Sequence, residues 1–115
     1  MNLWHGASME EVSLPCCHGS IIQFYVRGKR LECAMYQRSA DLILGVPVNI
    51  ASYALLTHIV ARLTGLEATK LHITLGDAHV YKNHLEQARE MLSRSSMDPP
   101  KLIIAPELKL SLIHI

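Results

Sequence analysis

The chain has 115 residues, half of them apolar and 18% charged, which is typical of a globular domain with a modest core. The net charge is +1 and no Lys/Arg cluster is present, so the sequence does not indicate a nucleic-acid-binding surface. The apolar stretches are shorter than a membrane span. No signal peptide is evident, and an odd number of cysteines argues against a disulfide framework. We therefore expect a cytoplasmic protein with neither a nucleic-acid nor a membrane partner.

The first half of the chain predicts a β-hairpin. Residues 1–13 show no period and are expected to form a loop. Residues 21–26, rich in β-branched and aromatic side chains, predict a strand. A tight turn over residues 27–30 leads into its antiparallel partner over residues 31–38. Residues 41–48, which contain glycine and proline, are expected to form a connection.

Residues 50–63 carry the clearest helical pattern. Asn49 stands at the expected N-cap and Gly65 at the expected C′ position. The segment is so apolar that the helix should be buried centrally. The apolar positions at helical spacing are Ile50, Ala54, Leu55, Ile59, Val60 and Leu63.

The last part of the chain predicts a strand, a helix and a second strand. Residues 70–75 predict a strand, which residues 78–81 are candidates to continue. Residues 83–93 begin with a capping pattern and predict a helix. Residues 95–100 are linker-like, and residues 102–104 are a short strand candidate.

A thiol and an imidazole are adjacent at Cys17 and His18. A thiolate becomes a strong nucleophile where a neighbouring cation or base lowers its pKa. Neighbours on a strand point to opposite faces, so a buried structural thiol is the competing interpretation for both Cys16 and Cys17. The cysteines and histidines form neither a CxxC pair nor an HExxH motif, so no metal site is predicted.

A cation, a hydroxyl and a carboxylate follow one another at Arg38, Ser39 and Asp41. A guanidinium beside a hydroxyl suits a phosphate dianion, because arginine presents a planar fork of donors. The competing interpretation is an arginine on a solvated strand end. Asp41 also fits a simple loop cap.

Three further side chains suit a nucleoside. The amide of Asn49 offers a donor and an acceptor to a pyrimidine edge, although the residue by itself favours an N-cap role. His79 and Tyr81 are two residues apart and would share one face of a strand. They suit a hydroxylated ligand, or alternatively they pack under a loop.

The order of these motifs resembles the central part of thymidylate synthase, over residues 14–104. The segments that carry the resemblance are YQRSADLILGVPVNIASYALLTH, LGDAHVYKNHLEQARE and PPKLII. The resemblance implies an α+β (mixed α/β) fold, with a sheet packed against a long buried central helix and incomplete at both ends. It also implies a partial catalytic domain over residues 1–106 and a tail unlike the family over residues 107–115.

Thymidylate synthases methylate dUMP to dTMP with 5,10-methylenetetrahydrofolate as co-substrate, which leaves as dihydrofolate. The resemblance implies that Cys17 adds to C6 of the pyrimidine, which makes C5 nucleophilic toward the one-carbon unit. His18 would be its neighbour in the catalytic network. Asp41 would lie between the two ligands and contact both the pyrimidine and the folate.

The same resemblance implies the binding residues for dUMP. Arg38 and Ser39 would bind the 5′-phosphate, with Gln37 in the adjoining network. Asn49 would read the pyrimidine edge, and since the similar dCMP hydroxymethylases have an acid there, asparagine favours uracil. The deoxyribose hydroxyl would be bound by His79 and Tyr81.

The sequence departs from the family pattern at three places. Cys16 stands where proline is usual, the spacing from Cys17 to Gln23 is one residue longer, and Val48 replaces a phenylalanine. Adjacency to His18 favours Cys17 over Cys16 as the nucleophile.

The chain is also less than half as long as a complete synthase, so we expect a fragment whose family partners are dUMP, folate and a second copy in a homodimer. The alternatives are an inactive remnant that binds nucleotide or dimerises with an intact synthase, and a related dCMP/dUMP hydroxymethylase.

Overall fold

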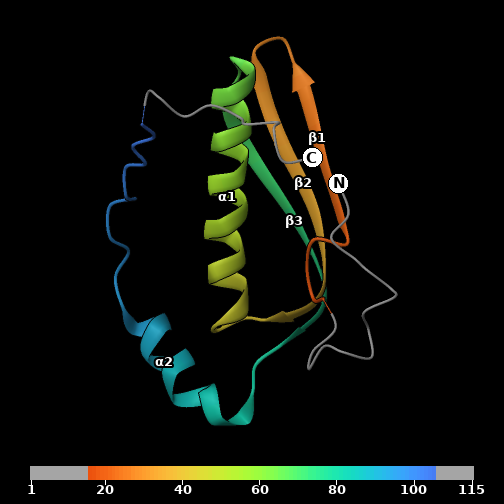
Figure 1. The fold of residues 1–115 in the computed structure, drawn as a ribbon. Coiled ribbons are helices and arrows are strands. Elements are labelled where there is room, and N and C mark those ends of the chain that lie inside the picture. Colours follow the sequence, from red (N-terminus) through yellow and green to blue (C-terminus); the bar gives the residue numbers. More distant parts are fainter. Residues whose placement is uncertain (1–15, 106–115) are drawn as a thin grey trace.

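Residues 16–105 are described by the structure, which is a computed structural model. The predicted mixed α/β fold class is confirmed: a three-stranded sheet of order β1-β2-β3 carries a long helix on one face (Figure 1). The expected loop over residues 1–13 and the tail over residues 107–115 lie outside this range. The elements are β1 (Ile21–Arg27), β2 (Arg30–Asp41), α1 (Gly45–Thr64), β3 (Glu67–His79), the 3-10 turn η2 (Lys82–His84) and α2 (Leu85–Ser93).

The predicted hairpin is confirmed, with β1 and β2 antiparallel. Gly28 opens the turn with φ of 60°, a left-handed conformation that glycine adopts without strain. Alternate residues of β2 are buried, and Leu31, Cys33 and Met35 face the core, where Ile22 is paired with Met35. One face of the hairpin therefore supplies half of the core.

β2, α1 and β3 form a parallel β-α-β unit. Near its start β3 contains a bulge: Leu31 is paired with Ala68 and Glu32 with Lys70, which leaves Thr69 without a partner. The hydroxyl of Thr69 donates to the Leu31 carbonyl at 3.1 Å, so the bulge keeps its hydrogen bonding.

β3 is longer than the sequence predicts, because the two expected strand segments are continuous and end at His79. Gly76 joins them. A Cβ atom at this position would lie 2.6 Å from both the Arg38 carbonyl oxygen and the Tyr36 hydroxyl. Glycine is therefore required where β3 passes this part of β2.

α1 begins earlier than predicted. It starts at Gly45, so Asn49 lies inside the helix and its predicted N-cap role is wrong. Pro47 is tolerated because the first N–H groups of a helix have no intrahelical partner. No side chain caps the start of α1; Asp41 instead holds the turn before it, where its Oδ1 accepts a hydrogen bond from the Ile43 N–H at 3.1 Å.

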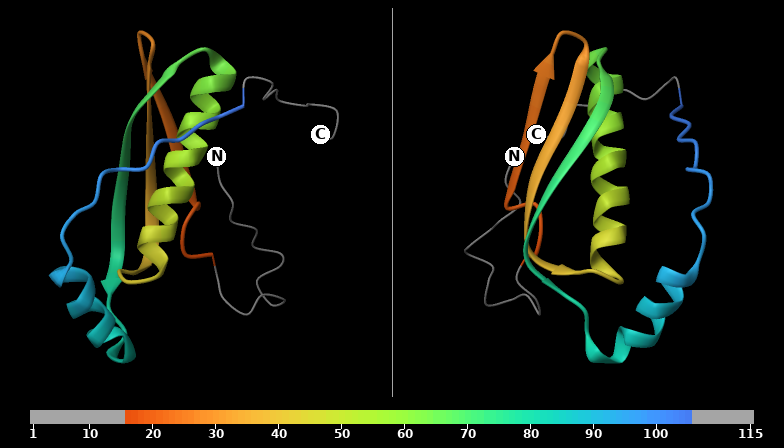
Figure 2. Two further views of the ribbon diagram at one scale, coloured as in Figure 1. Left: turned by 90° about the vertical axis from the view of Figure 1, so that its left-hand side faces the viewer. Right: turned by 180° about the vertical axis from the view of Figure 1, so that it is seen from behind.

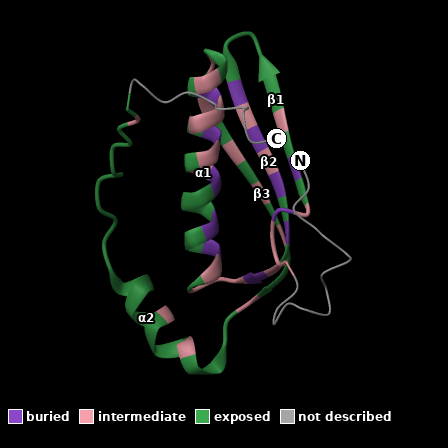
Figure 3. Ribbon diagram, in the orientation of Figure 1, coloured by how far each residue is buried: buried purple, intermediate pink, exposed green. Residues whose placement is uncertain are grey.

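The long helix packs on the sheet as expected and ends at Gly65, which has φ of 68°. Its burial is one-sided, however, as Figure 3 shows. On the side away from the sheet, Val48 and Leu55 are 63% and 43% exposed. Figure 2 shows α1 across one face of the sheet, and within residues 16–105 no other helix or strand covers the opposite face. The buried residues of α1 are Val46, Asn49, Tyr53, Thr57 and Ala61.

By length and apolar composition alone, α1 is the one helix within residues 16–105 that would be long enough to cross a membrane. This is weak support for a span, because the core helix of a soluble protein passes the same test.

The predicted second helix is confirmed as α2, but no side-chain cap forms at its start and none of its residues is buried. The strand predicted over residues 102–104 is wrong: residues 101–105 are irregular. Leu102 and Ile104 line a hollow together with Ala61 and Arg62, which lie near the C-terminal end of α1. Without a hydrogen-bonded neighbour, an apolar run does not become a strand.

Candidate active site

The candidate residues gather at one end of the sheet. This end is formed by the carboxyl ends of β2 and β3, the start of α1 and the segment before β1 (Figure 2). In parallel β-α-β units, ligands bind beyond the carboxyl ends of the strands. The topology therefore brings residues from four segments to the edge where a ligand is expected.

Cys17 lies beside Arg38. The Arg38 N–H donates to the Cys17 carbonyl at 2.8 Å, which extends the pairing with β2 to the segment before the start of β1. The turn between Cys17 and β1 is made at Gly19, where φ is 76°. Cys16, Cys17 and His18 are all half-buried. The predicted nucleophile and the predicted phosphate-binding residue are thus neighbours through the backbone.

His18 contacts α1. Its Nδ1 lies 2.9 Å from the Tyr53 hydroxyl, and the two rings meet edge to face at 5.6 Å. Tyr53 is 4% exposed, and burial raises the pKa of its phenol, so the hydroxyl stays protonated. Our sequence analysis did not list Tyr53 as a site residue. The signal was the polar spacing Asn49, Tyr53, Thr57, which places three hydrogen-bonding side chains on one helix face.

Gln37 and Asn49 form a buried amide pair. The Gln37 Nε2 donates to Asn49 Oδ1 at 2.9 Å and to the Ser39 carbonyl at 3.1 Å. Because Asn49 Oδ1 accepts from Gln37, the NH₂ group of Asn49 is left as a donor. The Gln37 Oε1 is buried without a hydrogen-bond partner in the described part of the chain. This end of the sheet therefore has one donor and one acceptor that a ligand or another segment would satisfy.

Arg38 and Ser39 point to different sides of β2. Alternation along the strand turns Ser39 toward α1, together with the buried Gln37, and turns the exposed Arg38 to the opposite face. A phosphate in contact with both Arg38 and Ser39 must therefore lie around the strand end.

Asp41 serves as the expected loop cap, in the turn before α1. Its hydrogen bond from the Ile43 N–H lowers the pKa of the carboxyl, which keeps it ionised. Asp41 is paired with His79 across the sheet, and the Leu42 N–H donates to the His79 carbonyl at 3.0 Å. The strand ends thus bring Asp41 and His79 together, while the predicted contact between Asp41 and folate stays a prediction.

His79 and Tyr81 do not share a strand face as predicted, because β3 ends at His79. Their rings nevertheless meet edge to face at 5.0 Å, and Tyr81 is 54% exposed. The His79 Nδ1 lies 3.1 Å from the Asp77 carbonyl oxygen. The two side chains form one aromatic group beside Asp41, which is where the deoxyribose role was predicted.

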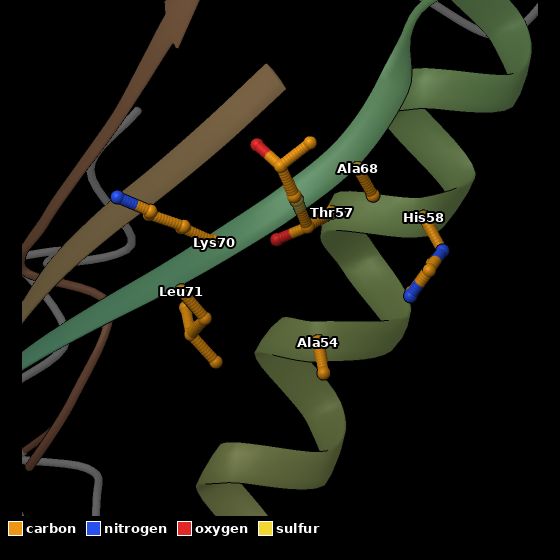
Figure 4. A pocket seen from close by; sticks show the side chains of 7 residues that line it. Ala54, Thr57, His58, Ala68, Lys70 and Leu71 are labelled. Atoms are coloured by element: carbon orange, nitrogen blue, oxygen red, sulfur yellow. The ribbon is translucent and has the colours of Figure 1, made fainter. Parts of the chain in front are cut away.

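A separate hollow lies between α1 and β3 (Figure 4). Its volume is about 200 Å³, which is below the range of typical ligand pockets. None of the candidate residues lines it, and residues 16–105 contain no group of three His, Cys, Asp or Glu side chains suited to a metal. The lining residues are Ala54, Thr57, His58, Ala68, Thr69, Lys70 and Leu71.

Comparison with known proteins gives the family. The family model described as "Thymidylate synthase" matches residues 1–114, a range that runs into the tail predicted over residues 107–115. Thymidylate synthases of three Listeria monocytogenes strains, serotype 4a HCC23 and serotype 4b CLIP80459 and F2365, are each 51% identical over 105 residues. The alignment covers 91% of this chain and 33% of each relative, so the chain spans about a third of their length. Because the family model matches nearly all of the sequence, the chain belongs to the thymidylate synthase family.

Proposed function

We propose that this chain supplies the nucleophile, the phosphate-binding strand end and the pyrimidine reader of a synthase that methylates dUMP to dTMP. The observation that carries the proposal is the 2.8 Å hydrogen bond from the Arg38 N–H to the Cys17 carbonyl, which joins nucleophile and phosphate site. The proposed setting is cytoplasmic, as expected for nucleotide biosynthesis.

Each side chain has a specific task in this proposal. The Cys17 thiolate adds to C6 of uracil, and the electron pair of the C5–C6 double bond moves toward C5 and O4. Negative charge therefore grows on O4, where the free NH₂ donor of Asn49 stabilises it. Arg38 binds the phosphate far from the reacting carbons, and this binding energy orients the ring.

The Asn49 orientation also favours dUMP over dCMP. Gln37 fixes Asn49 with its NH₂ group as the donor, which suits the acceptor O4 of uracil. The exocyclic amine of cytosine is itself a donor, so the two would face each other unpaired. A dCMP hydroxymethylase is therefore the less favoured alternative.

5,10-Methylenetetrahydrofolate would supply the one-carbon unit and the hydride when bound. Asp41 fits a place beside it, since an ionised carboxylate at the helix start accepts N–H donors such as those of a pterin. The task of Asp41 in this proposal is to orient both ligands.

We also propose that the open face of the sheet is the contact between two copies of the chain. It exposes large apolar side chains on neighbouring strands, with Ile21 at 62%, Tyr25 at 52% and Tyr36 at 39%. Contiguous apolar surface of this kind is typical of an interface. The homodimer implied by the family resemblance would cover it.

Covalent trapping tests the proposed function. The purified chain is incubated with 5-fluoro-dUMP and 5,10-methylenetetrahydrofolate and measured by denaturing mass spectrometry. The expected result is a mass increase that matches both ligands and maps to Cys17. Cys17→Ala should abolish the adduct, while Cys16→Ala and Cys33→Ala should retain it. If Cys17→Ala still formed the adduct, the nucleophile would be assigned wrongly.

The second candidate is a remnant that binds nucleotide or pairs with an intact synthase without turnover. The observation that favours it is the apolar outer side of α1, which nothing covers within residues 16–105. Saturable dUMP binding, or co-purification with an intact synthase, in the absence of any adduct would support this candidate. An intact synthase serves as the positive control for trapping.

A further inference from the structure

Cys16 and Cys17 are two adjacent thiols, and both are half-buried. The third cysteine of the chain, Cys33, is 0% exposed in the core, in a cluster with Ile22 and Tyr53. Burial also raises the pKa of the Cys33 thiol, which keeps it protonated. The accessible thiols of this chain are therefore an adjacent pair at the candidate site.

The pair lies just before β1, and the backbone there is joined to β2 by the hydrogen bond from the Arg38 N–H to the Cys17 carbonyl. The Cys16 thiol donates to the backbone carbonyl of His18. A thiol is a weak donor, so withdrawing this hydrogen bond takes little free energy. Gly19 gives the segment a turn with positive φ directly after His18. The Cys16 sulfur is therefore free to turn toward its neighbour.

The backbone favours a bridged pair over a direct disulfide. Adjacent Cα atoms are about 3.8 Å apart, which is below the roughly 4.4 Å at which ordinary disulfides begin. A direct sulfur–sulfur bond would thus be strained and easily reduced. One extra atom between the sulfurs lengthens the bridge and removes most of that strain. The atom must be soft and must accept two thiolates.

We propose that Cys16 and Cys17 form a dithiol site for trivalent arsenic compounds. With an organoarsenic oxide, two arsenic–sulfur bonds form and the arsenic–oxygen double bond breaks. The oxygen leaves as water with the two thiol protons, and arsenic stays trivalent, so no oxidant is needed. Because the second thiol binds within the same chain, its effective concentration is on the order of millimolar or higher, and a dilute monothiol does not displace the bridge.

Phenylarsine oxide is the probe for this site. The chain is loaded with one equivalent in the absence of nucleotide, challenged with submillimolar glutathione and measured by mass spectrometry. The expected product is one phenylarsenic group per chain, formed with loss of one water. After the challenge, Cys16→Ser and Cys17→Ser should each retain at least about tenfold less arsenic than the parent chain. Cys33→Ala, the matched control, should retain it, and 2,3-dimercaptopropanol should remove it from all variants.

Three results would overturn the proposal: retention by either serine variant, loss in Cys33→Ala, or a product with two chains per arsenic. Circular dichroism of each variant shows whether the fold is kept, and peptide mapping places the arsenic directly. Since no nucleotide is present, failure here is distinct from failure of the proposed enzymatic function. Where 5-fluoro-dUMP trapping succeeds, prior arsenic loading should block it.

Discussion

The two faces of α1 differ in an unexpected sense. The inner face places Asn49 and Tyr53 against the sheet, at 8% and 4% exposure. The outer face leaves Val48 and Leu55 exposed among the described residues. Apolar residues are spread around α1, so hydrophobicity alone does not fix which side of the helix meets the sheet. Hydrogen bonding decides instead, because the inner polar atoms meet partners on the sheet and in the segment before β1.

The largest expected effect is on the inner face. Tyr53→Ala removes a buried ring from the core and the hydroxyl contact of His18. We expect a loss of about 3–5 kcal/mol in the free energy of unfolding, as for other large aromatic truncations. Urea unfolding followed by circular dichroism measures it. A loss below about 1 kcal/mol would show that the inner face is not the packed one.

The next effect concerns the amide pair. Gln37→Met keeps the volume but removes the donor to Asn49 and to the Ser39 carbonyl. We expect a loss of about 1–3 kcal/mol, since Asn49 Oδ1 stays buried without its partner. Gln23→Met, on an exposed position of β1, is the matched control and should leave the unfolding midpoint nearly unchanged. If the unfolding midpoint shifted equally in both variants, the stabilising hydrogen bond between Gln37 and Asn49 would be contradicted.

A smaller, pH-dependent effect on stability is expected at Asp41, in the turn before α1. The pKa of Asp41 is lowered in the folded state by the Ile43 hydrogen bond. Its stabilisation is complete above the unfolded value of about 3.9 and is lost as the pH falls through the folded pKa. Asp41→Asn should thus be less stable than the parent at neutral pH, with a difference that shrinks in acid. Asp98→Asn is the control, and thermal unfolding from pH 2 to 7 is the measurement.

The smallest effect is expected on the outer face. Leu55→Gln places an amide where a leucine is 43% exposed, and we expect a change within about 0.5 kcal/mol. Solubility should rise, because an exposed apolar side chain is removed. Static light scattering and urea unfolding measure the two quantities. A loss as large as that of Tyr53→Ala would mean that the outer face is also packed.

Local patterns predicted most of the elements. Alternation around Leu31, Cys33 and Met35 predicted the hairpin and its buried face, and Gly65 predicted the end of α1. The start of α1 was missed because the helix begins at Gly45, four residues before Asn49, after a turn in which the Asp41 carboxylate accepts from the Ile43 N–H. That contact depends on where the strand ends, which propensity does not give.

The sequence predicted which residue types belong to the candidate site, but it did not predict how those residues contact one another. Cys17, Arg38, Asn49 and His79 were chosen by their chemistry and by resemblance, and their functional roles stay predictions. The contact between His18 and Tyr53 joins residues far apart in sequence, so no local rule points to it. The strand predicted over residues 102–104 fails for the same reason, since pairing depends on a neighbour that sequence alone does not place.

The bulge at Thr69 determines which face of the sheet each later residue of β3 points to. Before it, residue numbers in paired positions differ by 37, as in Arg30 with Glu67, and after it by 38, as in Asp41 with His79. Without this single step, Lys70 and His72 would point at α1 in place of Leu71 and Ile73. The one extra residue at Thr69 thus keeps Lys70 and His72 out of the core and pairs His79 with Asp41 at the end of the sheet where the candidate residues gather.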